Sequence, residues 1–433
     1  MAKVLIASIG RGRYAPTNYQ IQDGNGELNS YYEKLTPRVL DRHFELDRVF
    51  LIGTPGSLWH EVYNAFCQSP QMEDCDPQYY EWLESCVQNH QANKNQLESL
   101  ERKLDNKLKC IVLDEGVSER QIWSNFAQIL ESIGINQPQV DGLTENDRIY
   151  IDITHAFRSL ALFQFLVFNF IKDILSEQNI QIAGVYYGLF DNSAPDTTPI
   201  VNLNPLLSLT EWTKGTYILK NIGNGYSISQ LLHQEGQSDA ANKVMRLSDA
   251  INLNYLDSIG ERSINLQNAL NRMDPVGPFQ YVKPTLDNFV DDFATPEAQR
   301  SEPQFQLKIA EWHLQNRRYA TFYITLTEAI VTYVCDCYGY RSNNRDDRKD
   351  IRDALGGAAR FNRTALDQVR QTRLGALYRN EINPVRRHIA HASFSDISQQ
   401  QLRNANPHAA VEEAGRRCQE VREIFEQGNN NCN

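Results

Sequence analysis

Short runs of β-branched and apolar residues recur in the first half of the chain, and segments with helical spacing of apolar positions separate them. Five of these runs are predicted strands: residues 3–8, 47–54, 108–113, 148–154 and 182–189. Strands that are buried on both faces and alternate with helices predict a mostly parallel, doubly wound α/β sheet of Rossmann-like topology. Ligands of such sheets bind beyond the carboxyl ends of the strands, so the loops after the strands are the expected binding region.

Helical patterns dominate the second half of the chain. With 433 residues, the chain exceeds what one hydrophobic core normally supports, so two or three domains are expected. We predict an α/β domain over residues 1–203, a mainly helical connector over residues 204–302, and an all-α domain over residues 303–433.

The formal net charge of −11 argues against a protein that coats nucleic acid without specificity, because neutralising phosphates needs clustered cations. Residues 301–433 nevertheless carry 19 Lys and Arg against 16 Asp and Glu. Residues 1–300 carry 24 Lys and Arg against 38 Asp and Glu, so the basic residues are concentrated in the C-terminal part. Between Arg341 and Arg387 there are eleven Arg and one Lys against six acidic residues. Arginine suits bidentate phosphate contacts, and a salt-bridged helical surface is the competing explanation.

Cysteine usage and hydropathy point to the interior of a cell. The eight Cys residues include no C-x-x-C pair, and the spacing of Cys335 and Cys337 fits neither a zinc knuckle nor a thioredoxin-like site, so reduced thiols are expected. Residues 1–10 lack the apolar length of a signal peptide. The longest apolar stretch, residues 156–171, is interrupted by polar residues. We therefore predict a cytoplasmic protein without a membrane partner.

Two glycines and two arginines follow the first predicted strand: Gly10, Arg11, Gly12 and Arg13. They satisfy a loose G-x-G-x-x-A pattern, but the dinucleotide-binding fingerprint needs a helix directly after the loop, and the turn at residues 23–26 indicates a hairpin instead. A dinucleotide-dependent enzyme is therefore disfavoured. The glycines more plausibly leave space for a phosphate that the two arginines attract, although arginines are common in surface loops without a ligand.

The loop after the fourth predicted strand gathers four polar side chains, Asp152, Thr154, His155 and Arg158. Thr154 and His155 lie where the chain turns into a helix, and Arg158 lies in its first turn. Asp152 can orient a ring nitrogen or a ribose hydroxyl. The alternative is structural: Asp152 caps the helix, and His155 is hydrogen-bonded within the core.

Near the C-terminus, Asn383 and Pro384 precede Arg386 and His391. Asn is a good N-cap and Pro fits the first helical position, so we predict a helix start with Arg386 in the first turn. Unpaired backbone N–H groups and the positive end of the helix would then attract a phosphate, and the pKa of a histidine lies near neutrality. Such a pair alone is a weak motif, because it is more often a solvated helix face.

In order and spacing, these segments resemble the CARF-HEPN ribonucleases of type III CRISPR defence, in the branch with a D-x-T-H-x-x-R-S segment. The resemblance is carried by residues 8–14, Gly53 and Thr54, residues 152–159, residues 186–188, and residues 386–391. It implies a CARF sensor domain at residues 1–203 and a HEPN ribonuclease domain at residues 303–433.

The resemblance also implies a ligand, a substrate and an assembly. Two sensor domains would form a dimer that binds a cyclic oligoadenylate. Cyclic tetra-adenylate is the expected activator, although ring size cannot be read from the residues. The implied ligand-binding residues are Ser8, Gly10, Arg11, Gly12, Arg13, Thr54, Asp152, Thr154, His155 and Arg158. The helical domain would cleave single-stranded RNA without metal or cofactor, at a composite site of a homodimer or larger homo-oligomer.

Family spacing assigns catalysis to Arg386 and His391. The family usually has Asn after the catalytic Arg, whereas this chain has Arg387, which precedes His391 by four residues and so shares its helix face. Arg387 is therefore a supporting or substitute phosphate ligand. His388 is a weaker candidate, because its spacing from His391 permits a metal site but no third zinc ligand is evident.

Two further possibilities stay open. A ligand-gated regulator that binds RNA or protein without cutting it would use the same Arg-rich stretch. The sensor domain could also degrade its own activator, since Thr154 and His155 can assist a ribose hydroxyl, but shape complementarity to a bound ring demands the same residues.

Overall fold

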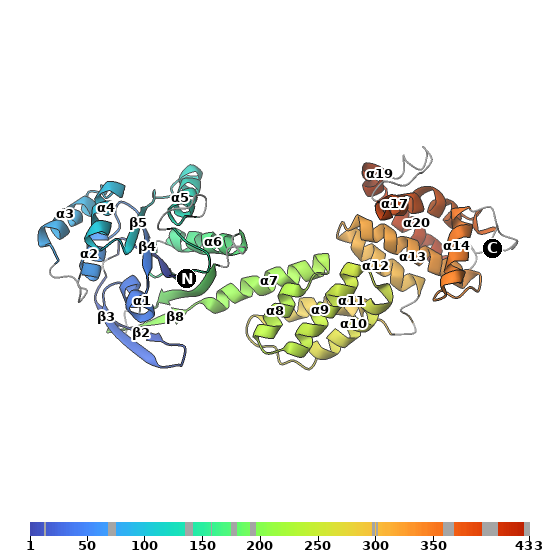
Figure 1. The fold of residues 1–433 in the computed structure, drawn as a ribbon, viewed down its shortest axis with the longest axis horizontal. Helices are drawn as coiled ribbons and strands as arrows, with labels where there is room; N and C mark the ends of the chain where they lie inside the picture. The colour runs from blue at the N-terminus through green and yellow to red at the C-terminus, as the bar shows by residue number, and fades with distance from the viewer. Residues whose placement is uncertain are drawn as a thin grey trace. The chain divides into compact units, whose positions relative to one another are not determined.

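The computed structural model describes residues 1–12, 14–67, 75–134, 142–156, 158–174, 180–190, 196–296, 299, 302–357, 368–391 and 406–427. The chain divides into two compact units, Met1–Leu206 and Leu207–Asn433 (Figure 1). The first is an α/β unit and the second is helical. Within these described ranges, no helix has the length and apolar character needed to cross a membrane.

One eight-stranded sheet runs through the first unit, in the order β3-β2-β8-β7-β6-β1-β4-β5. The strands are β1 (Lys3–Ser8), β2 (Thr17–Gln22), β3 (Leu28–Glu33), β4 (Arg48–Gly53), β5 (Leu108–Val112), β6 (Arg148–Asp152), β7 (Gln181–Gly188) and β8 (Thr197–Asn202). The block from β7 to β5 is parallel, whereas β8 is antiparallel to β7 and β3 is antiparallel to β2. The carboxyl ends of β6, β1 and β4 therefore meet at one end of the sheet.

The sheet confirms the predicted α/β class and contains one strand that was not predicted. All five predicted strands are present, as β1, β4, β5, β6 and β7, and the predicted hairpin is the pair β2 and β3. Five of the seven strand pairings are parallel, so the sheet is mostly parallel as predicted. Two antiparallel pairings, β2 with β3 and β7 with the unpredicted β8, make it a mixed sheet. β8 contains Pro199, and proline cannot donate a ladder hydrogen bond, so its sequence is a weak strand pattern.

Helices cover both faces of β1. The helices of this unit are α1 (Thr36–Phe44), α2 (Trp59–Cys67), α3 (Pro77–Gln88), α4 (Lys94–Lys103), α5 (Glu119–Ser132) and α6 (Arg158–Ile174). Leu5 and Ala7 of β1 belong to the core that α1 to α4 share. Val4 and Ile6 are also fully buried, and they point to the opposite face because side chains alternate along a strand. This two-sided burial is typical of a central strand in a doubly wound sheet.

The second unit contains two hydrophobic cores that meet at one helix. Its elements are α7 (Asn204–Ile222), α8 (Tyr226–Gln234), α9 (Ser238–Leu253), α10 (Leu256–Leu270), α11 (Phe279–Phe293), α12 (Pro303–Gln315), α13 (Tyr319–Cys337), α14 (Arg345–Gly356), α16 (Arg373–Leu377), the π-helix η3 (Tyr378–Ile382), α17 (Asn383–Ala390), α19 (Pro407–Glu412) and α20 (Ala414–Glu426). On α12, Phe305 and Ile309 join the core of α7 to α11. Leu307 and Ala310 join the core of the helices that follow.

The cysteines depart from the sequence prediction. Cys67 and Cys75 form a disulfide with their Cα atoms 5.6 Å apart, and Cys337 is also disulfide-bonded. The prediction of reduced thiols throughout is therefore wrong. It rested on the absence of C-x-x-C spacing, whereas Cys67 and Cys75 are eight positions apart and meet because α2 and α3 pack together. The described free cysteines are Cys86, Cys110, Cys335 and Cys418.

His313 of α12 is a fully buried histidine, and neither ring nitrogen has a hydrogen-bond partner among the described residues. Burial, aided by the charge of Arg318, lowers the pKa of His313 to about 3. The unfolded chain therefore binds a proton below about pH 6.5 that the folded chain does not bind. This site contributes stability above pH 6.5, and the contribution is lost as the pH falls from 6.5 toward 3.

We expect His313→Leu to remove this part of the pH dependence. Between pH 7 and pH 5 the wild-type chain should lose about 2 kcal/mol of unfolding free energy at this site, and the variant should not. Urea denaturation at the two pH values measures the difference. His408→Gln is the matched control, because the side chain of His408 is 81% exposed. Equal pH dependence in His313→Leu and wild type would contradict the buried-histidine argument.

Candidate functional site

The loops after β1, β4 and β6 form one cluster of polar groups at the carboxyl ends of three adjacent parallel strands. The guanidinium of Arg11, after β1, donates from Nη2 to Thr54 Oγ1, after β4, at 3.2 Å. The ring of Tyr14 lies 4.1 Å from the ring of His155, after β6, measured between centroids. The structure thus brings together residues from three of the predicted binding loops. Arg13 lies outside the described residues, and Arg158 is described only by its backbone at the start of α6.

Gly10 fixes how closely two of these loops approach. A Cβ atom at Gly10 would lie 2.5 Å from the carbonyl oxygen of His155 and 2.8 Å from the hydroxyl of Tyr14. The Gly10 N–H donates to the same Tyr14 hydroxyl at 3.2 Å. Any side chain at position 10 would therefore separate the β1 loop from the β6 loop.

His155 is held within the protein. Its Nε2 accepts a hydrogen bond from the Thr36 N–H at 3.2 Å and lies 3.3 Å from the Thr36 hydroxyl. The side chain is buried, and burial lowers the pKa of His155 to about 3. The neutral His155 ring, with its Nε2 bonded to Thr36, therefore holds the loop after β6 in position. It matches the structural role that the sequence left open for this residue.

Asp152 and Thr154 tie the same loop to β7. Asp152 Oδ1 accepts hydrogen bonds from both the N–H and the hydroxyl of Thr154, and Thr154 Oγ1 accepts from the Gly188 N–H at 2.8 Å. Asp152 is fully buried, its Oδ2 has no partner among the described residues, and burial raises the pKa of Asp152 to about 7. The carboxyl group therefore titrates near neutrality, and its protonated form can donate a hydrogen bond.

Hydrogen bonds to neighbouring groups hold the loop after β4 where it meets Arg11. The Thr54 N–H donates to Ser57 Oγ at 2.8 Å, and the Ser57 hydroxyl donates to the Ile9 carbonyl at 2.7 Å. The Trp59 indole N–H donates to the Thr54 carbonyl at 2.9 Å. Arg11 also forms an ion pair with Glu115, in the loop after β5.

The sequence analysis missed Ser57, Thr36, Tyr14 and Glu115. Ser57 and Glu115 each follow a predicted strand by a few residues, which was an available signal. Tyr14 directly follows Arg13 in the loop after the first predicted strand but was named only within residues 8–14 of the resemblance, and Thr36 follows no predicted strand. Of the remaining predicted residues, Ser8 is the fully buried last residue of β1 and Gly12 is exposed in the loop beyond it.

The predicted helix start at Asn383 is wrong. α16, η3 and α17 run on without a break from Arg373 to Ala390, and Asn383 has helical dihedral angles, φ −64° and ψ −34°. Pro384 lacks an N–H and would crowd the carbonyl four residues earlier in an ordinary α-helix. The wider π-turn of η3, directly before it, accommodates the ring. Arg386 therefore lies inside a helix and not beside the unpaired N–H groups of a helix start.

Arg386 and His391 face different surroundings. Arg386 is half-buried, and its Nη2 donates to Asn383 Oδ1 at 3.0 Å. Burial raises the pKa of the neighbouring Tyr378 phenol, and the charge of Arg386 opposes this shift. His391 is exposed at the end of α17, and its N–H donates to the Arg387 carbonyl at 3.0 Å. Arg387 shares the helix face of His391, as i and i+4 positions do. His388 is half-buried, and its Nε2 has no partner among the described residues.

Ion pairs explain part of the Arg-rich stretch. Arg348 and Arg352 both pair with Glu328, and other described pairs are Arg341 with Asp347 and Arg373 with Glu420 and Glu423. Within the described ranges, no ion pair involves Arg386 or Arg387. No group of three or more His, Cys, Asp or Glu that could hold a metal occurs in the same ranges.

Two family models match the chain. Residues 4–191 match the model described as CRISPR system endoribonuclease Csx1, CARF domain. Residues 208–300 match the model described as CRISPR-associated protein MJ1674, second domain. The α/β unit and the first part of the helical unit are thus similar to two domains of CRISPR-associated proteins.

A curated relative extends this similarity. CRISPR-associated protein MJ1674 of Methanocaldococcus jannaschii is 28% identical over 382 residues, which is 81% of this chain. The chain spans 57% of the length of that relative. The matches support a CRISPR-associated, CARF-containing protein similar to Csx1 and MJ1674. The predicted CARF resemblance is therefore confirmed for residues 4–191, and the HEPN assignment stays a prediction.

We expect Gly10→Ala to destabilise the α/β unit, because the new methyl group would overlap the His155 carbonyl. Overpacking of this kind costs about 1–3 kcal/mol. Chemical denaturation of the variant and the wild type measures the loss. Gly24→Ala is the matched control, since no atom lies within 4 Å of a Cβ at that position. Equal losses of unfolding free energy in the two variants would contradict the claim that the close contact at Gly10 makes this position sensitive to a methyl group.

Proposed function

We propose that this protein is an endoribonuclease of type III CRISPR defence that a cyclic oligoadenylate activates. The observation that carries the proposal is the convergence of the loops after β1, β4 and β6 in a unit similar to a CARF domain. Those loops offer what an adenylate ring needs, namely a cationic side chain, hydroxyl groups and close-packed backbone.

Each group has a distinct chemical use. Arg11, with Arg13 beside it in the sequence, attracts phosphates, and the exposed backbone at Gly12 leaves space for them. Gly10 lets the loop after β1 pack closely against the loop after β6 and so positions Arg11. The Thr54 hydroxyl donates to a phosphate or ribose oxygen. Arg158 adds a second cation after β6. Asp152, Thr154 and His155 hold the β6 loop in its conformation and so position these groups, and Ser8 ends the strand from which Arg11 projects.

An apolar stripe on α6 supports a dimer. Leu162, Leu166 and Phe170 are spaced by four residues and are 64%, 57% and 38% exposed. On α5, which contacts α6 through Phe126, Trp123 is 62% exposed. Exposed apolar clusters of this kind mark protein interfaces. A second copy is the natural partner, because α6 begins at the ligand loops and a symmetric ring can be shared across a two-fold axis.

In this proposal the helical unit, which carries Arg386 and His391, cleaves the RNA. One Arg and one His per chain are few groups for phosphodiester chemistry, and two chains supply a pair of each. The 2′-hydroxyl loses its proton and attacks the adjacent phosphorus, the bond from phosphorus to the 5′-oxygen of the next nucleotide breaks, and that oxygen takes up a proton. The Arg386 guanidinium stabilises the developing negative charge, and His391 moves a proton or aligns the nucleophile. Arg387, on the same face as His391, assists at the phosphate. The products carry a 2′,3′-cyclic phosphate, and no metal takes part.

A second candidate function has its own support. A CARF-type regulator that binds RNA or protein without cutting it fits the ion-paired arginines, and it fits the position of Arg386 inside a helix, where no helix terminus adds to its phosphate affinity. Cleavage assays separate the two candidates.

We expect wild-type protein to cut a labelled single-stranded RNA when cyclic tetra-adenylate or cyclic hexa-adenylate is added, and to do so in EDTA. Arg386→Ala and His391→Ala should each lower the rate at least 100-fold, because each removes a group that acts in the transition state. Gel analysis of the RNA measures cleavage. Arg345→Ala is the matched control, since Arg345 is exposed on the same unit and should keep the wild-type rate. Uncut RNA in every lane would favour the non-catalytic regulator, and loss of cutting in EDTA would overturn the metal-independent mechanism.

Light scattering should give about twice the 49.7 kDa mass of one chain. Phe170→Glu puts a charge into the α6 stripe and should shift the protein toward monomer, with loss of RNA cleavage. Leu253→Glu alters a leucine of α9 that is 61% exposed and should leave the dimer intact. A wild-type monomer that cleaves RNA at full rate would contradict the composite site.

A further inference from the structure

The two edges of the eight-stranded sheet differ. β5 forms one edge and β3 forms the other (Figure 1). An edge strand presents unpaired N–H and C=O groups, which are a template for pairing with another chain unless the protein covers them. Whether an edge is covered therefore indicates whether it can serve as an interface.

Side chains cover the backbone groups at the β5 edge. The even-numbered residues of β5 direct their N–H and C=O groups away from β4, because the ladder hydrogen bonds to β4 use the odd-numbered residues. The Cys110 N–H donates to Glu101 Oε1 at 2.6 Å, and the Val112 carbonyl accepts from Gln128 Nε2 at 2.8 Å. An incoming strand would have to displace both side chains.

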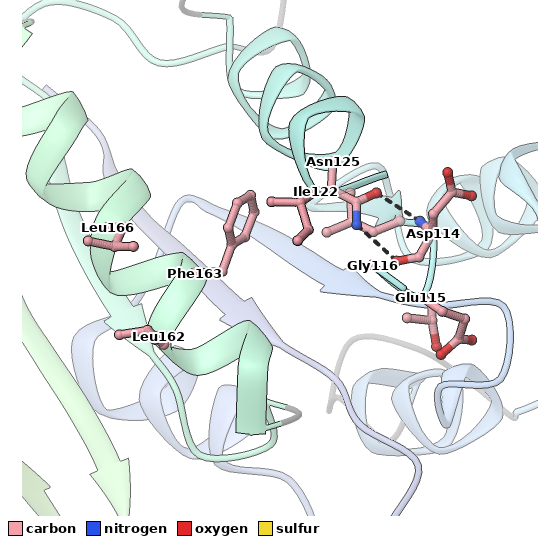
Figure 2. Close-up of a pocket in the computed structure, with 10 residues that line it drawn as sticks. Asp114, Glu115, Gly116, Ile122, Asn125, Leu162, Phe163 and Leu166 are labelled. Carbon is pink, nitrogen blue, oxygen red and sulfur yellow. Dashed lines mark hydrogen bonds between the residues drawn. The ribbon is translucent and has the colours of Figure 1, made fainter. Parts of the chain in front are cut away.

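The chain directly after β5 is covered in the same way. Asn125 Nδ2 donates to the Asp114 carbonyl at 2.9 Å, and Asn125 Oδ1 accepts from the Asp114 N–H at 2.9 Å. Figure 2 shows both hydrogen bonds, with Asn125 reaching from α5 to the loop. Glu101 belongs to α4 and Gln128 to α5, so two helices together close this edge of the sheet.

The edge at β3 is not covered in this way. The ladder hydrogen bonds to β2 use odd-numbered residues, since the pair next to the turn is Asp23 with Glu27. Leu28, Ser30 and Tyr32 therefore direct their N–H and C=O groups away from the sheet, and no described residue hydrogen-bonds to these groups. β3 also contains no proline, lysine or bulge, which are common means of protecting an edge.

One face of β3 is covered by α1, and the other face is exposed. On the covered face, the guanidinium of Arg42 lies 5.3 Å from the centre of the Tyr31 ring and pairs with Glu33 at 2.7 Å. On the opposite face, Leu28 and Tyr32 are 62% and 67% exposed. The same strand thus offers open backbone groups and exposed apolar side chains.

A second copy of β3 fits this edge because the strand is complementary to itself. In an antiparallel pairing with Ser30 of both copies on a two-fold axis, Leu28 of each copy lies opposite Tyr32 of the other. The outward backbone groups of the two strands then form about six hydrogen bonds. The two Leu–Tyr pairs cover the exposed apolar side chains, and cross-strand pairs of this kind stabilise a sheet.

The charges beside the axis allow this pairing. Glu27 of each copy lies opposite Glu33 of the other, so two carboxylates meet at each end of the paired strands. Arg42 already pairs with Glu33 and is 48% exposed, so it supplies the counter-charge for both carboxylates.

We propose that the β3 edge is a self-association surface, through which the sheets of two copies join into one continuous sheet. The inference depends neither on the ligand nor on RNA cleavage. A protein that also pairs through the α6 stripe has two different two-fold interfaces, and the use of both joins dimers into larger, even-numbered assemblies. The β3 contact is small, so it is weak by itself and acts at high protein concentration.

Sedimentation velocity between about 5 and 500 μM protein tests the surface, because this range brackets a weak contact. The wild type should be a dimer at the lowest concentration and should form even-numbered assemblies at the highest. Tyr32→Lys places a charge opposite Leu28 of the other copy and should raise the concentration needed for assembly at least tenfold. Tyr281→Lys is the matched control, because Tyr281 lies on α11 and is 72% exposed, and it should assemble like the wild type.

Ser30→Pro tests the backbone pairing. The Ser30 N–H points away from β2, so proline keeps the ladder within the hairpin and removes a donor at the two-fold axis. This variant should also stay a dimer at every concentration, and circular dichroism checks that it is folded. If Ser30→Pro does not fold, the comparison of Tyr32→Lys with Tyr281→Lys decides alone.

Phe170→Glu separates this inference from the proposed function. With the α6 stripe disrupted, the chain should pass from monomer to dimer through β3 as the concentration rises, and adding Tyr32→Lys should leave it monomeric. A wild type that stays a dimer at the highest concentration overturns the β3 surface and leaves the proposed function intact. Equal assembly of Tyr32→Lys and Tyr281→Lys also overturns it. A wild type that assembles through β3 but cuts no RNA contradicts the proposed function alone.

Discussion

The close approach of Gly10 to the backbone of His155 determines how the loops of the candidate site are arranged. At this point the loop after β1 lies against the loop after β6, and no Cβ atom fits between them. Both loops follow buried parallel strands, so their starting positions are already fixed by the sheet. The contact then fixes the direction in which the chain continues toward Arg11. Preorganisation of this kind lowers the entropy that a ligand must overcome on binding.

Buried titratable groups on either side of this contact hold the loops in a single arrangement. His155 is a neutral acceptor for Thr36, and Asp152 is a fully buried acceptor for Thr154. Burial lowers the pKa of His155 and raises that of Asp152, so both groups favour their uncharged forms. The cationic side chain of these loops, Arg11, is half-buried, with 32% of the side chain exposed.

The sequence predicted the parallel core of the sheet and the loops that meet at its end, because strands buried on both faces leave an unmistakable apolar pattern. It did not predict β8, whose Pro199 and polar residues hide its strand character. The sequence identified Asp152, Thr154 and His155 as site residues. It could not show that the Thr36 N–H donates a hydrogen bond to His155 Nε2, because the two residues are 119 positions apart. Asn383 and Pro384 are residue types that often begin a helix, but here the helix that precedes them does not end. The π-turn of η3 accommodates Pro384, so the helix continues past Asn383.

α12 belongs to two hydrophobic cores, with Phe305 and Ile309 in one and Leu307 and Ala310 in the other. A helix shared in this way cannot lose its packing on one side while keeping its full stability on the other. The connector helices and the C-terminal helices are therefore expected to melt as a single cooperative block. Substitutions in α7 to α11 would then alter the integrity of the segment that carries Arg386, even without touching it.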